Sequence, residues 1–79
     1  MKPKIPDVLF EYWELVQFMM ETPGMYGLDS RRMDLHDKLC DAYNLDHDET
    51  KEITGSLDKF KNPEEFHKAL IDFGGVLST

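Results

Sequence analysis

The chain has 79 residues, with nine lysines or arginines against sixteen aspartates or glutamates, so its formal net charge is −7 with neutral histidines. This length allows one small domain and is too short for a catalytic α/β scaffold with a deep cleft. Hydrophobic residues are 41% and charged residues 32% of the chain, a globular balance that argues against full disorder.

The beginning of the chain predicts a short arm followed by a helix. We expect residues 1–5 to form a flexible arm and Pro6 to open a helix over 7–21, because a proline in the first turn loses no needed donor. The Thr-Pro-Gly sequence at 22–24 ends that helix. The prolines and Asp7 also interrupt the basic start before any apolar run, so we expect no secretory leader.

A second helix is predicted over residues 30–43. Asp29 precedes it and is a suitable N-cap, because its carboxylate can accept hydrogen bonds from the free amides of the first turn. Leu28 and Met33 have the spacing of a hydrophobic staple around that cap. Asn44 is expected to end the helix, since asparagine tolerates the left-handed conformation.

A third helix is predicted over residues 47–60. Asp46 and Glu49 have the spacing of a capping box at its start. Gly55 is a weak point in this helix, because glycine costs about 1 kcal/mol relative to alanine in a helix interior.

The fourth helix, over residues 63–73, has the clearest start signal in the chain. Asn62 is a good N-cap, and Pro63 fits the first helical position. The glycine pair at 74–75 ends the helix. Residues 76–79 form a tail that is too short to assign.

These elements predict an all-α fold, a compact single-domain bundle of about four short helices over residues 6–75, because no run alternates with the period of a strand. The first helix has the widest apolar arc, so we expect it to be the most buried, with Trp13 in the core. The five methionines of the chain add adaptable apolar surface. Among them, Met19, Met20 and Met33 are expected in the core.

Phe10, Glu14 and Phe18 fall on the polar arc of the first helix. They lie four residues apart, so they align on one face. Exposed aromatic side chains on an acidic background are the usual anchors of protein interfaces, and we predict that these three residues bind a partner. Two alternatives stay open: the C-terminal tail or the loop at 22–28 covers a ring, or this face is the seam of a homodimer.

A second candidate surface is acidic. Asp34, Asp37 and Asp41 line one face of the second helix within an acid-rich stretch. Such a face can steer association with a basic partner. It can also imitate the phosphates of a nucleic acid and so block a protein that binds DNA or RNA. The plainer interpretation is a solvated face that maintains solubility.

Catalytic and metal-binding chemistry finds little support. His36 and Cys40 lie four residues apart and His47 follows, which gives three possible zinc ligands without Cys-x-x-Cys spacing. We favour a buried cysteine beside a hydrogen-bonded histidine, and we predict no enzyme activity, no metal and no cofactor. Residues 44–48 look like the opening of a calcium loop, but the loop's glycine and bidentate glutamate do not follow.

The predicted function is that of a small, acidic, non-catalytic protein-binding or regulatory module. In size, acidity and helicity the chain is similar to small cytoplasmic regulators and to small phage proteins that bind a host factor. The alternatives are an acidic nucleic-acid mimic that inhibits a DNA- or RNA-binding protein, and a homodimeric structural domain. We expect no direct nucleic-acid binding, no membrane span and, from the single cysteine, a cytoplasmic location.

Overall fold

The computed structural model describes residues 5–22, 24 and 26–77 of the chain. Four helices follow one another in these residues: α1 (Asp7–Glu21), α2 (Asp29–Tyr43), α3 (His47–Thr54) and α4 (Pro63–Asp72). Two single-turn 3-10 helices lie between them, η1 (Tyr26–Leu28) and η2 (Leu57–Lys59). The described part of the chain contains no strand, and the predicted all-α bundle is confirmed.

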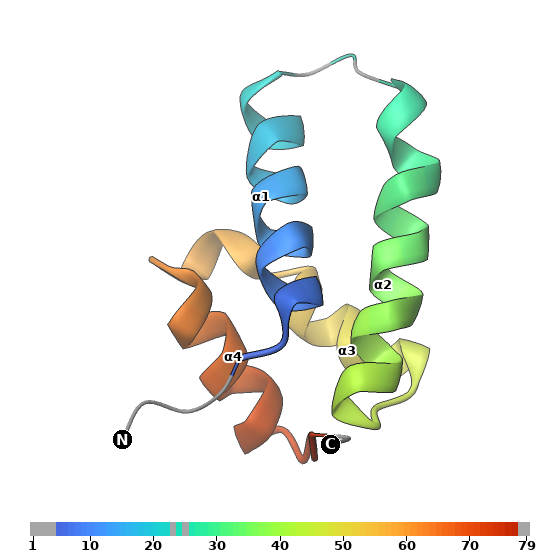
Figure 1. The fold of residues 1–79 in the computed structure, drawn as a ribbon. Coiled ribbons are helices and arrows are strands. Elements are labelled where there is room, and N and C mark those ends of the chain that lie inside the picture. The colour runs from blue at the N-terminus through green and yellow to red at the C-terminus, as the bar shows by residue number, and fades with distance from the viewer. Residues whose placement is uncertain (1–4, 23, 25, 78–79) are drawn as a thin grey trace.

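α1 and α2 form an antiparallel pair, and α3 and α4 pack across one end of it (Figure 1). That end holds the beginning of α1 and the end of α2. At the opposite end, which we call the free end, α1 finishes and α2 begins, and neither α3 nor α4 reaches it in Figure 1. Side chains at the free end therefore have fewer neighbours to cover them.

The core lies where the four helices meet. It consists of ten buried apolar side chains: Leu9, Tyr12, Leu35, Leu39, Tyr43, Leu45, Ile53, Leu57, Phe66 and Leu70. Phe66 of α4 is fully buried, and its ring centre lies 5.8 Å from that of Phe60 and 6.1 Å from that of Trp13. Trp13 is partly buried, so it packs against the core that was predicted to contain it.

The prediction that the first helix is the most buried was wrong. α1 buries two of its 15 residues, Leu9 and Tyr12, whereas α2 buries four residues over the same length. Met20 and Met33, which were expected in the core, are 52% and 61% exposed, and Met19 is partly buried. The physical reason is that a wide apolar arc is buried only where neighbouring helices cover it, and at the free end neither α3 nor α4 covers α1 and α2.

The entry into α2 also differs from the prediction. The chain arrives through η1, which makes Leu28 the N-cap and places Asp29 inside the first turn, with no side-chain cap hydrogen bond. The carboxylate of Asp29 instead lies 3.9 Å from the guanidinium of Arg32. The staple of Leu28 with Met33 is not formed as predicted, since Leu28 is itself the cap and Met33 is exposed.

The start of α3 is as predicted, and its end is not. Asp46 Oδ1 accepts a hydrogen bond from the Glu49 amide at 2.8 Å, and Glu49 Oε1 accepts one from the Asp46 amide at 3.2 Å. The helix stops at Thr54 with Gly55 as its C-cap, and η2 follows. Glycine has a low helix propensity, so ending the helix there costs little free energy. Leu57, in the η2 turn that follows, is buried in the core.

α4 begins as its sequence signal predicted and ends one residue earlier than expected. Asn62 Oδ1 accepts a hydrogen bond from the Glu65 amide at 2.9 Å, and Pro63 occupies the first turn. Gly74 then adopts a φ of 122°, a conformation that favours glycine. At Gly75 a Cβ atom would lie 2.7 Å from the carbonyl oxygen of Leu70, so only glycine fits there.

The described part of the C-terminal tail is fixed to the end of α2. Asn44 has the predicted left-handed conformation, with φ of 53°, and its Nδ2 donates to the Val76 carbonyl at 2.6 Å. The Val76 amide donates to the Tyr43 carbonyl at 2.8 Å, and Leu77 packs against the core. Of the predicted arm at residues 1–5, Ile5 packs against the core, and the rest lies outside the described residues.

One buried hydrogen bond joins α2 to α4. The hydroxyl of Tyr43 lies 2.6 Å from Nδ1 of His67, and both side chains are buried. Burial raises the pKa of Tyr43 and lowers the pKa of His67. Both groups are therefore neutral in the folded chain, and in the tautomer with the ring proton on Nε2 the tyrosine hydroxyl donates to Nδ1.

We expect the free energy of unfolding to decrease as the pH falls below about 6.5. In the unfolded chain His67 gains a proton near its ordinary pKa of 6.5, whereas in the folded chain its pKa is lowered by burial. The unfolded state therefore binds more protons in this range, so stability is lost as the pH falls and is fully present above it. Urea unfolding between about pH 8 and about pH 5 measures the effect. His67→Gln, which cannot titrate, should reduce the slope, and an unchanged slope would assign it to other groups.

Candidate functional site

The predicted partner-binding residues Phe10, Glu14 and Phe18, which we call the ridge, lie on the surface of α1 and are open to solvent. Phe10 is 39% exposed and Phe18 is 46% exposed, and Glu14 between them is also exposed. The described tail is bound near Tyr43, at the end of the helix pair that also holds Phe10. Even so, the described parts of the tail and of the loop at 22–28 leave both rings with a large part of their surface in water.

Met20 and Met33 add apolar surface that the sequence pattern did not predict. Met20 lies one residue from the end of α1, and Met33 lies in the second turn of α2, so both belong to the free end of the helix pair. Each is more than half exposed. Helical periodicity gives no signal for this exposure, because it depends on how far α3 and α4 extend.

The three predicted acids on α2 are all exposed, but they have different surroundings. Asp34 pairs with Lys38 at 3.4 Å, one helical turn along the same face. Oδ1 of Asp37 lies 3.1 Å from Nε2 of His47, the first residue of α3. These local contacts leave a less uniform acidic stripe than the sequence pattern indicated.

The structure brings His36, Cys40 and His47 together at the junction of α2 and α3. Each offers one potential ligand atom, and these atoms lie within 4.8 Å of one another. His36 and Cys40 share a helix face because they are four residues apart. The left-handed Asn44 reverses the chain after α2, and the capping box starts α3 at once, so His47 returns to that same face.

Several contacts hold these side chains in place. His36 Nδ1 lies 3.7 Å from the sulfur of Cys40. The thiol also lies 3.8 Å from the carbonyl oxygen of Asp46, to which it can donate. The His36 ring is tilted against Tyr12, with ring centres 6.1 Å apart, and stacks on His47 at 5.5 Å. The predicted pairing of a buried cysteine with a neighbouring histidine is therefore present.

The surroundings of His36 and Cys40 favour the neutral forms of these two side chains in the absence of a ligand. Burial, together with the nearby His47, lowers the pKa of His36. Burial raises the pKa of the Cys40 thiol. A catalytic cysteine needs a thiolate that is stabilised by a positive neighbour. Here the raised pKa of Cys40 disfavours the thiolate, and the lowered pKa of His36 disfavours the imidazolium.

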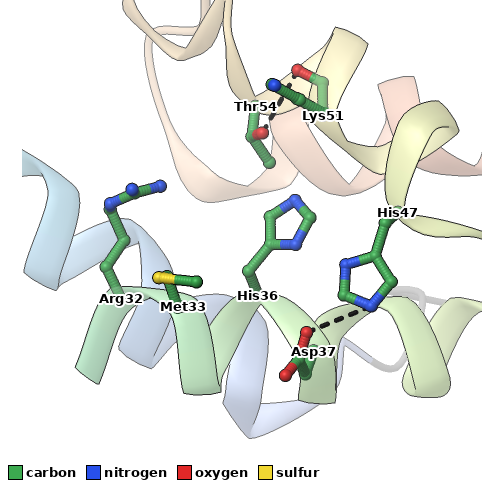
Figure 2. A pocket seen from close by; sticks show the side chains of 7 residues that line it. All are labelled: Arg32, Met33, His36, Asp37, His47, Lys51 and Thr54. Carbon is green, nitrogen blue, oxygen red and sulfur yellow. Dashed lines mark hydrogen bonds and ion pairs between the residues drawn. The ribbon is translucent and has the colours of Figure 1, made fainter. Parts of the chain in front are cut away.

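A cavity of about 260 Å³ opens beside the cluster. Figure 2 shows the residues that line it: Arg32, Met33, His36, Asp37, His47, Lys51 and Thr54. Both imidazoles border the cavity, and Arg32 lies at the far side from His47. Asp37 is the residue whose role the sequence did not reveal, because its contact with His47 depends on the turn between α2 and α3.

Comparison with known proteins gives no match to a protein-family model, to a curated protein or to a solved structure. None of the helices in the described residues has the length and apolar character needed to cross a membrane. Function is therefore inferred from the exposed face of α1 and from the junction of α2 and α3.

Proposed function

We propose that this protein is a non-catalytic protein-binding module whose anchors are Phe10, Glu14 and Phe18 on α1. The observation that supports the proposal is the exposure of both phenylalanines, at 39% and 46% of their surface. Aromatic side chains that insert into a partner's pockets are typical hot spots, each contributing about 2 kcal/mol or more to binding. Their regular spacing on one rigid helix means that little conformational entropy is lost on binding.

The partner that fits this face has apolar pockets with a basic residue between them. Glu14 lies between the two rings, one turn from each, and Glu11 on the same helix is also exposed. A lysine or arginine opposite Glu14 would fix the register of the complex and suppress wrong partners. The net charge of −7 favours association with a basic surface for the same reason.

A second copy of this chain is the less favourable occupant. Glu14 is the midpoint of the ridge, so antiparallel pairing about a two-fold axis would place it against its own symmetry mate. Like charges facing each other at an interface cost binding energy, and each copy also carries the net charge of −7. We therefore assign the ridge to a different protein.

The acidic-mimic alternative has weaker support. Asp34 and Asp37 make local contacts with Lys38 and His47, so their carboxylates are not free to imitate evenly spaced phosphates.

The environment of Cys40 supports a non-catalytic role, because burial raises the pKa of its thiol and so disfavours the reactive thiolate. As part of the same proposal we place the protein in the cytoplasm, which suits a free cysteine.

We expect the double substitution Phe10→Ala and Phe18→Ala to abolish capture of the partner. Losing two aromatic anchors of about 2 kcal/mol or more each would weaken binding by a factor of about 10³. Tagged wild-type and variant proteins are used to capture binders from a lysate of the source organism, and mass spectrometry quantifies each binder. Both side chains are exposed, so circular dichroism should show an unchanged fold.

The matched control neutralises Asp34, Asp37 and Asp41 to asparagine on the other surface. This variant should retain the binder that the double phenylalanine variant loses, with only a modest salt dependence. The opposite pattern, loss of the binder with the asparagine variant and retention with the alanine variant, would replace the proposal by the acidic mimic. A dimer mass in light scattering that Phe18→Glu converts to monomer would assign the ridge to self-association.

A further inference from the structure

We infer that His36, Cys40 and His47 form a binding site for Zn²⁺, with Asp37 as the residue that orients His47. The candidate ligand atoms lie within 4.8 Å of one another on two adjoining helices. Two imidazoles and one thiolate are ligands that Zn²⁺ prefers. The site is independent of the proposed protein-binding ridge, which lies on α1.

The pair on α2 already has the spacing of a zinc chelate. Zinc binds nitrogen at about 2.0–2.1 Å and sulfur at about 2.3 Å, so a tetrahedral angle places these two ligand atoms about 3.6 Å apart. His36 Nδ1 and Cys40 Sγ are 3.7 Å apart. The contact of the His36 ring with Tyr12 limits its rotation. The distance between these two ligand atoms is therefore already close to that in a zinc chelate.

His47 is oriented by Asp37 in the way that metal-binding histidines are usually oriented. Its Nε2 lies 3.1 Å from Oδ1 of Asp37, and a proton on Nε2 would leave Nδ1 with the free lone pair. Figure 2 shows that this second nitrogen is on the side of the ring that faces His36. A carboxylate that accepts from the non-ligating nitrogen fixes the tautomer and raises the basicity of the ligand.

The fourth ligand would come from solvent. The cavity of about 260 Å³ that borders both imidazoles has room for a water molecule. Arg32 and Lys51 line this cavity, so a small anion could replace that water. The bound ion would join α2 to the start of α3, and it would stabilise the fold because the unfolded chain does not hold the three ligands together.

The test is titration of the reduced, metal-free full-length chain with Co²⁺ and then with Zn²⁺. Co²⁺ should give thiolate-to-metal charge transfer and the strong visible absorption of a tetrahedral site, saturating at one ion per chain. Zn²⁺ should displace it and raise the melting temperature. Metal binding should not change the oligomeric state, because the three ligands belong to one chain. Absence of the charge-transfer band, or saturation at one ion per two chains, would overturn the assignment.

Variants separate this site from adventitious binding. Cys40→Ser should remove the charge-transfer band, and the exposed His47→Asn should weaken Zn²⁺ binding by more than about 100-fold without disturbing the core. Asp37→Asn should weaken binding by about 10–100-fold, as expected for a partner that orients a ligand. Asp41→Asn, one turn further along α2, and His67→Gln are the matched controls and should leave binding unchanged. Equal affinity in His47→Asn, Asp37→Asn and the controls would show that His47 does not bind the ion and that Asp37 does not orient a ligand, which would overturn the assignment.

Discussion

Replacing Phe66 by alanine lowers the free energy of unfolding by about 3–5 kcal/mol, the largest effect that we expect from any single substitution in this chain. Phe66 is fully buried, and its ring packs against the rings of Tyr12 and Trp13 on α1 and of Phe60, which follows η2. Alanine would remove these contacts and leave a cavity that the rigid helices cannot close. A domain of this size has about 5–15 kcal/mol of stability in total, so the substitution would remove a large share of it.

Urea unfolding followed by circular dichroism measures this loss. The matched control is Phe73→Ala, at the C-terminal end of α4, where the side chain is 42% exposed. We expect a cost below about 1 kcal/mol there, because little apolar surface returns to water. If both variants lost the same stability, Phe66 would not be the centre of the core. Such a result would contradict the packing of α4 against α1.

Tyr43→Phe should lower the free energy of unfolding by about 1–3 kcal/mol, because it leaves a buried acceptor without a partner. The hydroxyl of Tyr43 is the group that lies 2.6 Å from Nδ1 of His67 in the interior. Phenylalanine keeps the volume of the ring, so the loss reports the hydrogen bond and not a cavity. Thermal and urea unfolding at about pH 8, where the imidazole is neutral in both states, measure it.

Tyr12→Phe is the matched control for this prediction. Tyr12 is also a buried tyrosine of the core, and its hydroxyl has no hydrogen-bond partner among the described side chains. We expect this substitution to change the free energy of unfolding by less than about 0.5 kcal/mol. Equal losses in both tyrosine variants would mean that the bond between α2 and α4 contributes nothing specific.

The proposed zinc site and the proposed protein-binding ridge can be tested independently. The ridge belongs to α1, and the three zinc ligands belong to α2 and α3. Phe10→Ala with Phe18→Ala should therefore leave Co²⁺ absorption unchanged, and His47→Asn should leave capture of the partner unchanged. Loss of both properties in one variant would instead indicate that the fold itself was damaged.

The amino-acid sequence by itself determined the features that depend on neighbouring residues along the chain. The capping box of Asp46 with Glu49, the cap at Asn62 and the left-handed Asn44 are all present as predicted. Each is a hydrogen bond or backbone preference within four residues, so local chemistry is sufficient to fix it. For Phe10 and Phe18 the sequence indicated only their position on the polar arc of α1 and left open whether the tail or the loop covers a ring; the structure decides their exposure.

Only the tertiary structure decided which apolar side chains are buried and which distant residues meet. Met33 was assigned to the core by its position on the helix, and it is exposed because α3 and α4 cover one end of the α1–α2 pair. His47 reaches His36 and Cys40 because the turn at Asn44 sets the angle between α2 and α3. Helical periodicity describes one helix at a time, whereas burial and ligand geometry depend on the lengths and angles of its neighbours.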